Sequence, residues 1–188
     1  KLRALEEELI KDGIFGARIA NMRVIEFQKR GLPHAHLLFI LQQRHAIKSA
    51  EHVDTVVCAE IPPHPSSIND PDLEVQQRKR DQAQKLRDLV LTNMVHGPCG
   101  NQKPGAPCMY NAQGDITEVC HKSFPKDFLK ETVWDDGQSY AQYRRRPPQH
   151  GKHEAFYKGR ELNNSWVVPY NPYLLLRYNC HINVEICA

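Results

Sequence analysis

The sequence lacks any long apolar run. Its longest, Leu37 to Leu41, has the length of a strand, whereas a membrane-spanning helix needs about 20 apolar residues. Six cysteines in 188 residues are too few for a disulfide scaffold. A Gly-rich loop ending in Gly-Lys-Ser/Thr is also missing, so ATP-driven activity must lie outside these residues. We therefore expect no membrane partner, and reduced thiols or a metal site for the cysteines.

The start of the chain lacks the pattern of a secretory signal, and its first residue is Lys. We therefore expect a piece of a longer intracellular protein. The length suits one domain, or one domain with an inserted module.

Net charge is small, at +3, but its distribution is uneven. Residues 51–75 hold six acids and no Lys or Arg, a net of −6. Residues 141–160 hold six bases and one acid, a net of +5. The second stretch could meet a polyanion that the first would repel.

The hydrophobic pattern predicts an α+β fold, in which helices flank an antiparallel sheet. We expect helices over 1–12 and 73–94, and strands over 23–28, 34–41, 53–61 and 182–186. Residues 96–125 read as a loop-rich insertion that holds three of the six cysteines, and residues 137–164 show no periodicity.

A hairpin with two histidines is the sharpest motif. His34 and His36 share one face of a strand, because side chains two residues apart point the same way. A connection over residues 29–33 would set Gln28 opposite His34 and Glu26 opposite His36, with Cβ atoms about 4.5–5.5 Å apart. Two imidazoles and a carboxylate would then form a divalent metal site with open positions.

The donor set leaves alternatives open. Gln28 could act as a carbonyl ligand instead of Glu26 or beside it, and Mn²⁺, Mg²⁺ or Zn²⁺ would suit the site. The alternative interpretation is an ordinary surface hairpin with two exposed histidines.

A second cluster of soft ligands lies in the insertion. His96, Cys99, Cys108 and Cys120 would close a tetrahedral zinc site, whose role would be structural because it leaves no open position. His121 is a fifth possible ligand. The alternative is a set of buried thiols beside a His-Gly-Pro turn.

Residues 140–146 mix aromatic and basic side chains. Bases of single-stranded DNA can stack on Tyr, and Arg or Lys can contact phosphate. The alternative is a solvated run of charge. The residues that we assign to DNA contact are Lys29, Arg30, Tyr140, Tyr143, Arg144, Arg145 and Arg146.

Residues 24–36, Val-Ile-Glu-Phe-Gln-Lys-Arg-Gly-Leu-Pro-His-Ala-His, resemble the Helitron helicase-like N-terminal domain, the Rep-type nuclease region of Helitron rolling-circle transposases. The resemblance continues in order along nearly the whole chain. The further matching blocks are residues 59–62, 96–100, 107–109, 123–126, 143–146, 166–173 and 178–185.

This resemblance implies the chemistry of an HUH endonuclease, a metal-dependent nickase and strand-transferase. The two histidines and a third polar ligand would hold one Mn²⁺ or Mg²⁺, and a tyrosine would attack a phosphate of single-stranded DNA. It also implies a partial HUH/Rep-like domain over residues 1–188 with 96–125 as an insertion, a helicase domain in the same polypeptide, and a nuclear location.

Two departures from the family pattern matter. The family's first Rep strand lies upstream of the first helix, where this chain starts. Its nucleophilic tyrosines lie beyond a strand that here ends at Cys187-Ala188. We therefore expect the nucleophile beyond residue 188 and assign it to no tyrosine in this chain. The alternative function is a Helitron-derived DNA-binding domain that no longer cuts.

Overall fold

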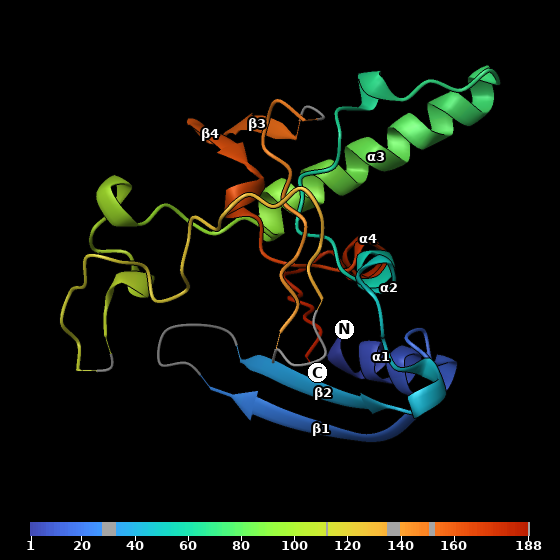
Figure 1. The fold of residues 1–188 in the computed structure, drawn as a ribbon, viewed down its shortest axis with the longest axis horizontal. Coiled ribbons are helices and arrows are strands. Elements are labelled where there is room, and N and C mark those ends of the chain that lie inside the picture. The colour runs from blue at the N-terminus through green and yellow to red at the C-terminus, as the bar shows by residue number, and fades with distance from the viewer. Residues whose placement is uncertain (28–32, 112, 135–139, 151–152, 188) are drawn as a thin grey trace. The chain divides into compact units, whose positions relative to one another are not determined.

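The computed structural model describes residues 1–27, 33–111, 113–134, 140–150 and 153–187 (Figure 1). It divides into two compact units, residues 1–48 and residues 49–188. Each unit combines helices with one two-stranded antiparallel sheet. The predicted α+β class with antiparallel strands is therefore confirmed. A single domain over the whole chain stays a prediction.

The first unit begins with the predicted helix. α1 (Leu2–Glu7) continues into a π-helical turn over Glu8–Asp12. Gly13 then ends the helix in the left-handed conformation, with φ of 59°, which costs glycine little because it has no Cβ.

A long hairpin follows, made of β1 (Arg18–Glu26) and β2 (His34–Leu41), the two blue arrows of Figure 1. Arg23 of β1 forms an ion pair of 3.1 Å with Glu6 of α1. The side chains that share the Arg23 face on β2, Leu37 and Phe39, are half-buried. This face of the hairpin therefore packs toward its own unit.

The opposite face of the hairpin is exposed. It carries Glu26, His34 and His36 at the end next to the connection. Four apolar side chains continue this face along the strands, each between 45% and 61% exposed: Met22, Val24, Leu38 and Ile40.

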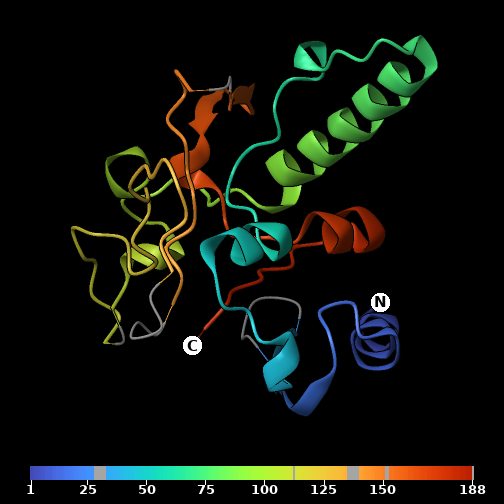
Figure 2. The same cartoon turned by 45° about the vertical axis from the view of Figure 1, so that its right-hand side comes forward.

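The second unit contains the remaining named helices and strands: α2 (Ala50–Val56), α3 (Leu73–Asn93), β3 (Glu154–Tyr157), β4 (Arg160–Asn163) and α4 (Pro172–Tyr178). α3 is the long green helix of Figures 1 and 2. Asp72 caps its start by accepting hydrogen bonds from the backbone N–H groups of Glu74 and Val75. The helix predicted over 73–94 is thus confirmed.

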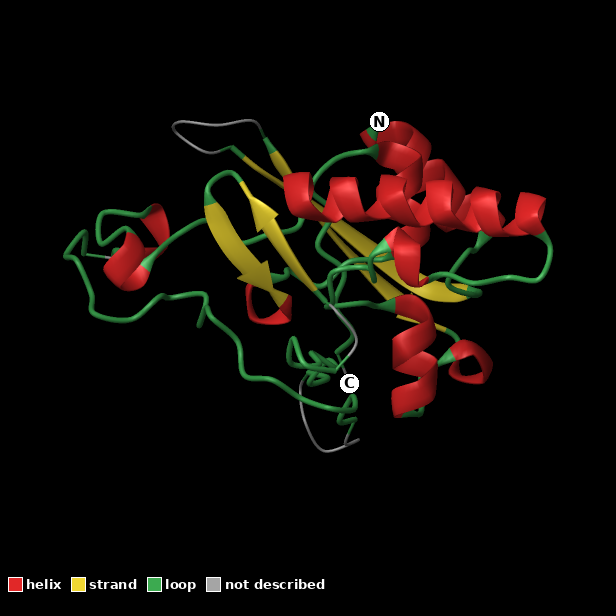
Figure 3. Ribbon diagram, turned by 90° about the horizontal axis from the view of Figure 1, so that it is seen from above, coloured by secondary structure: helices red, strands yellow, loops and turns green. Residues whose placement is uncertain are grey.

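The core of this unit joins the C-terminal half of α3 to β4 and α4. Its buried members are Ile61, Val90, Leu91, Met94, Leu162, Val167, Tyr170 and Leu175. The end of α2 meets the start of α4, since Asn171 Nδ2 donates to the Val56 carbonyl over 2.7 Å (Figure 2). Loops form a large part of what remains, shown green in Figure 3.

Three segments differ from the prediction. The strand expected over 53–61 starts as α2, because Val53, Val56 and Val57 follow helical spacing and Ser49 caps the helix by accepting from His52 N. Residues 182–186 form no strand and pair with none among the described residues. The stretch 137–164, for which no element was expected, contains β3 and β4.

Candidate metal centres

The histidine hairpin has a different register from the predicted one. Glu26 lies opposite His34, and Val24 lies opposite His36. The predicted pairing of Glu26 with His36 is therefore wrong by two residues. A shift of two residues keeps every side chain on its face, so Glu26, His34 and His36 still share one face.

The carboxylate reaches one histidine diagonally. Glu26 Oε2 lies 3.0 Å from His36 Nε2, and both side chains are more than half exposed. His34 is exposed on the same face, directly across from Glu26. The arrangement offers a carboxylate and two imidazoles at an open surface. Such donors suit a divalent ion that keeps water ligands.

The structure does not draw all three hairpin donors together. In the described part of the chain, one group of at least three His, Cys, Asp or Glu side chains has all its ligand atoms within 4.8 Å of one another, and it lies elsewhere. Gln28, Lys29 and Arg30, which the sequence assigned to metal or DNA, lie outside the described residues.

That group consists of the four residues predicted to bind zinc: His96, Cys99, Cys108 and Cys120. His96 Nε2 lies 3.3 Å from Cys108 Sγ and 3.5 Å from Cys120 Sγ. A tetrahedral zinc site with bonds of about 2.3 Å to sulfur and about 2.0 Å to nitrogen sets its ligand atoms about 3.5–3.8 Å apart. The four side chains therefore fit a zinc ion without large movement.

Short loops bring these ligands together across 25 positions of the sequence. His96 follows α3 and donates its backbone N–H to the Trp166 carbonyl over 2.8 Å. Its ring stacks on Phe124, with centroids 4.3 Å apart and planes 7° apart. The backbone N–H of Lys122 donates to Cys120 Sγ over 3.4 Å. The histidine orientation and one sulfur are thus fixed by neighbours that are not ligands.

The three thiols ionise unequally, and burial opposes the ionisation of each. Burial, followed by the neighbouring Cys120 and Cys108, raises the pKa of Cys99 to about 12, and burial also raises the pKa of Cys108. Burial opposes ionisation of Cys120 as well, but hydrogen bonds from the backbone of Phe124 and Lys122 and from the thiols of Cys108 and Cys99 together outweigh burial and lower the pKa of Cys120. A bound dication would stabilise all three thiolates together.

The imidazole is held in the form that can ligate. Burial lowers the pKa of His96, and the positive charges of Arg160, Lys122 and Lys126 lower it further. A neutral imidazole offers a lone pair to a metal, whereas an imidazolium has none. The structure therefore brings the predicted zinc ligands together in a form suited to the metal.

The basic stretch is not the exposed platform that the sequence suggested. Tyr143 is 8% exposed, and its hydroxyl accepts from the backbone N–H of Ile186 over 2.8 Å. Arg145 is 5% exposed and donates through Nη1 to the carbonyls of Ala59, Asn164 and Val167. Burial lowers the pKa of this guanidinium to about 10. These two side chains support the interior, which corrects their assignment to DNA.

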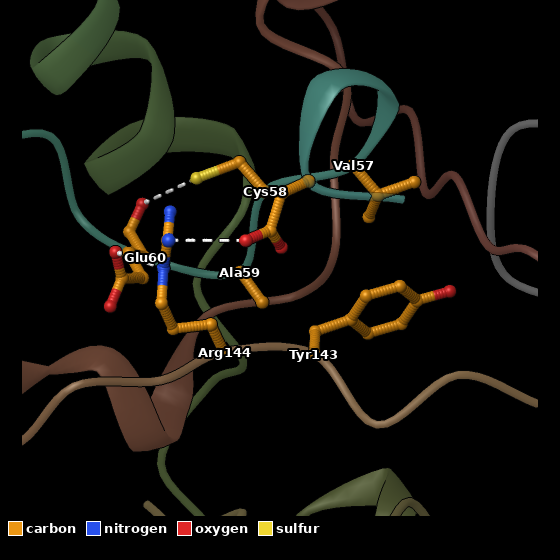
Figure 4. A pocket seen from close by; sticks show the side chains of 7 residues that line it. Val57, Cys58, Ala59, Glu60, Tyr143 and Arg144 are labelled. Atoms are coloured by element: carbon orange, nitrogen blue, oxygen red, sulfur yellow. Dashed lines mark hydrogen bonds and ion pairs between the residues drawn. The ribbon is translucent and has the colours of Figure 1, made fainter. Parts of the chain in front are cut away.

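The flanking arginines pair with acids. Arg146 bonds Glu60 through its backbone N–H and its guanidinium, with Nε 2.9 Å from Oε1. Arg144 lies 3.1 Å from Asp54, in a small pocket that Cys58, Glu60 and Tyr143 also line (Figure 4). Their charges are therefore largely satisfied within the protein. Tyr140, at 61% exposed, remains open to a stacking partner.

Sequence reasoning missed Glu60 as an organising residue. Its side chain is 5% exposed and accepts from Arg146 and from Asn164 Nδ2. Asn164 in turn accepts from the backbone N–H of Ile61 over 2.7 Å. The only signal was the position of Glu60 within the block 59–62, which the resemblance had picked out without giving it a role.

Comparison with known families supports the N-terminal part of the resemblance. Residues 1–39 match the family model described as "Helitron helicase-like domain at N-terminus". The match spans α1, β1 and most of β2, and it includes Glu26, His34 and His36. The resemblance is therefore confirmed over these residues, and it indicates a Helitron-related function in general.

Two further comparisons are brief. A search of curated proteins found no match. Among the described residues, no helix is long and apolar enough to cross a membrane.

Proposed function

We propose that the chain is the HUH/Rep-like nuclease module of a Helitron-type rolling-circle transposase or helicase, and that it nicks single-stranded DNA. The observation that carries the proposal is the histidine hairpin. Glu26 contacts His36 over 3.0 Å, His34 shares their face, and all three lie in the segment that matches the Helitron family.

The chain's own residues would position a metal and a phosphate. His34, His36 and Glu26 would hold Mn²⁺ or Mg²⁺, which when bound neutralises charge on a scissile phosphate. Gln28 would add a carbonyl ligand, and Lys29 and Arg30 would contact neighbouring phosphates. The nucleophilic tyrosine and the helicase domain would belong to other parts of the same polypeptide, which would act in the nucleus.

The first test is metal binding by calorimetry. Mn²⁺ would be titrated into zinc-loaded protein, because Mn²⁺ stands lowest in the divalent affinity order and would leave a thiolate zinc site intact. Loss of a residue that only contacts a metal ligand lowers metal affinity about 10–100-fold. We expect His36→Ala and Glu26→Gln, which change ligands themselves, to weaken Mn²⁺ binding by at least as much. His52→Ala removes an exposed histidine of α2 and should bind as the parent does.

Two outcomes would contradict the hairpin site: Mn²⁺ binding that all three variants retain, or its absence in the parent. Incubating single-stranded DNA with a longer polypeptide that contains residues 1–188 then distinguishes DNA cutting from DNA binding. A covalent protein–DNA adduct on a denaturing gel, lost in His36→Ala, supports the nuclease. Binding of single-stranded DNA without an adduct supports the alternative, a DNA-binding domain that no longer cuts.

We also propose that His96, Cys99, Cys108 and Cys120 hold a structural zinc ion. The four ligand atoms gathered within 4.8 Å of one another carry this proposal. Their loops enclose few apolar side chains of their own: the buried cluster contains Ala106 and Met109 besides Cys99 and Cys120. A metal that stabilises such loops contributes directly to folding.

Zinc content tests this proposal. Protein purified without added metal should contain one zinc ion per chain, as measured by elemental mass spectrometry. Cys108→Ser should lose most of it, since a hydroxyl is a poor zinc ligand beside a thiolate. Cys187→Ser changes an exposed cysteine outside the cluster and should keep the zinc. Equal zinc in both variants, or none in the parent, would contradict the site.

A further inference from the structure

Arg160 lies beside the Cys and His cluster although it is not one of the ligands. It begins β4, and its guanidinium carbon stands 5.0 Å from the centre of the Trp166 ring. Trp166 packs against the small apolar cluster formed by Cys99, Ala106, Met109 and Cys120. The charge of Arg160 acts on both His96 and Cys99. The guanidinium therefore lies over Trp166, a residue that borders the candidate zinc site.

Two of its donors have no acceptor. The Nε and Nη2 atoms of Arg160 are buried and make no hydrogen bond within the part of the chain that the structure describes. A buried charged N–H group without a partner costs more than an ordinary unmade hydrogen bond. Such a group in a folded protein calls for an explanation, and an acceptor that forms when a metal binds is one.

Charge counting shows what the site lacks. A zinc ion with three thiolates and a neutral imidazole carries a net charge of −1. A single fixed cation at the edge of the site would cancel this charge, and N–H groups aimed at sulfur would disperse it. Lys122 and Lys126 also act on His96, but Lys122 is exposed and Lys126 lies over Phe124.

We propose that Arg160 is the positioning residue of the zinc centre, and that its unpaired N–H groups donate to thiolate sulfur, with Cys99 as the candidate acceptor, when the metal is bound. Trp166 fixes the guanidinium plane for this contact. The inference rests on the zinc site proposed above and adds a function for a residue outside its four ligands. The consequence is tighter zinc binding and thiolates that react more slowly.

Arg160→Gln is the central variant, because it removes the charge and keeps a polar side chain. Arg160→Lys keeps the charge and loses the planar fork. Lys158→Gln is a matched control, since Lys158 belongs to the same hairpin and lies 5.1 Å over the Tyr157 ring in a comparable cation–π contact. All four proteins would be prepared loaded with zinc and, separately, with Co²⁺.

Three measurements apply to each protein. Competition with a chromophoric chelator gives the zinc affinity, and the sulfur-to-cobalt absorption band reports the electron density on the thiolates. The rate of cysteine alkylation in the zinc-loaded form reports thiolate reactivity. For Arg160→Gln we expect an affinity about 10–100-fold lower, a shifted cobalt band and faster alkylation. Arg160→Lys should fall between, and Lys158→Gln should match the parent.

The outcomes separate this inference from the zinc site itself. A parent that binds no zinc overturns the site, and this inference with it. A parent that binds zinc, with Arg160→Gln equal to it in affinity, cobalt band and alkylation rate, overturns the role of Arg160 alone. A lower melting temperature in both zinc-loaded and zinc-free Arg160→Gln, without a change in those three readouts, would assign Arg160 to packing on Trp166 and also overturn it.

Discussion

At the scale of single residues, the buried acid Glu60 joins separate segments of the second unit. Burial alone would raise its pKa, but the hydrogen bonds from Arg146, together with the charges of His153 and Arg146, outweigh burial and hold the pKa below its usual range. Arg144 Nε lies 3.6 Å away, and Asn164 Nδ2 donates over 3.3 Å. One buried carboxylate therefore links residue 60 to Arg144, Arg146 and Asn164, which lie more than 80 positions further along the chain.

This predicts an acid-sensitive contribution to stability. A carboxyl group with a lowered folded pKa stabilises the protein above its unfolded pKa, here near 4.5, and the contribution disappears as pH falls through the folded pKa. Glu60→Gln should lose about 1–3 kcal/mol at neutral pH and show a flatter dependence below pH 4.5. Urea unfolding at pH 3–7 measures both effects.

The matched control is Glu161→Gln, which changes an exposed acid of β4. It should follow the parent at every pH. If Glu60→Gln has the same pH profile as the parent, the ion pair with Arg146 does not stabilise the folded state in the way described.

At the scale of elements, the sequence predicted correctly those helices and strands whose ends are set by nearby residues. α1 with its π-helical turn ends at a glycine, and α3 begins at an aspartate cap. β1 and β2 alternate, and a Gly-Leu-Pro sequence precedes β2. The register was missed by two residues because it depends on the length of the connection, which hydrophobic alternation does not determine.

The errors arose where tertiary contacts override local pattern. Ile182, Val184 and Ile186 alternate like a strand, but the segment instead contacts the Pro169 carbonyl and the Tyr143 hydroxyl. β3 and β4 were missed because they are only four residues each. Their turn places Lys158 and Gly159 at positive φ, and Lys-Gly is a weaker hairpin signal than Asn-Gly.

The candidate sites show the same division. Spacing alone put His34 and His36 on one face, and ligand chemistry alone grouped His96 with three cysteines. Neither argument could show that Tyr143 and Arg145 are buried, because a run of Arg and Tyr is usually exposed. Nor could they find Arg160, because it lies 40 residues after Cys120 in the sequence. Its guanidinium lies over Trp166, which borders the cluster.

At the scale of the whole molecule, part of the uneven charge of the sequence is paired within the second unit. The acidic stretch 51–75 and the basic stretch 141–160 meet in the second unit, where Asp54 pairs with Arg144 and Glu60 with Arg146. The opposing charges therefore hold distant segments together. DNA affinity would have to come from other cations, such as those of the hairpin connection.

The second unit also contains two buried clusters that we expect to differ in how far their folding depends on zinc. The main core around Val90 and Leu175 is apolar and needs no metal. The cluster around Cys99 and Cys120 has little apolar area to bury, and it touches the main core through Trp166. We therefore expect zinc removal to loosen one region and to leave the other folded.

Hydrogen exchange with and without a chelator tests this. Three amides hold the zinc loops in register: His121 N donates to the Cys108 carbonyl, Thr117 N to the Met109 carbonyl and Lys122 N to Cys120 Sγ. Their protection should fall about tenfold for each 1.4 kcal/mol that zinc contributes, while the amides of the C-terminal half of α3 keep theirs. Unchanged exchange over residues 99–122 would count against metal-dependent folding. Equal loss in α3 would mean that the second unit unfolds as one body, because Trp166 couples its two clusters.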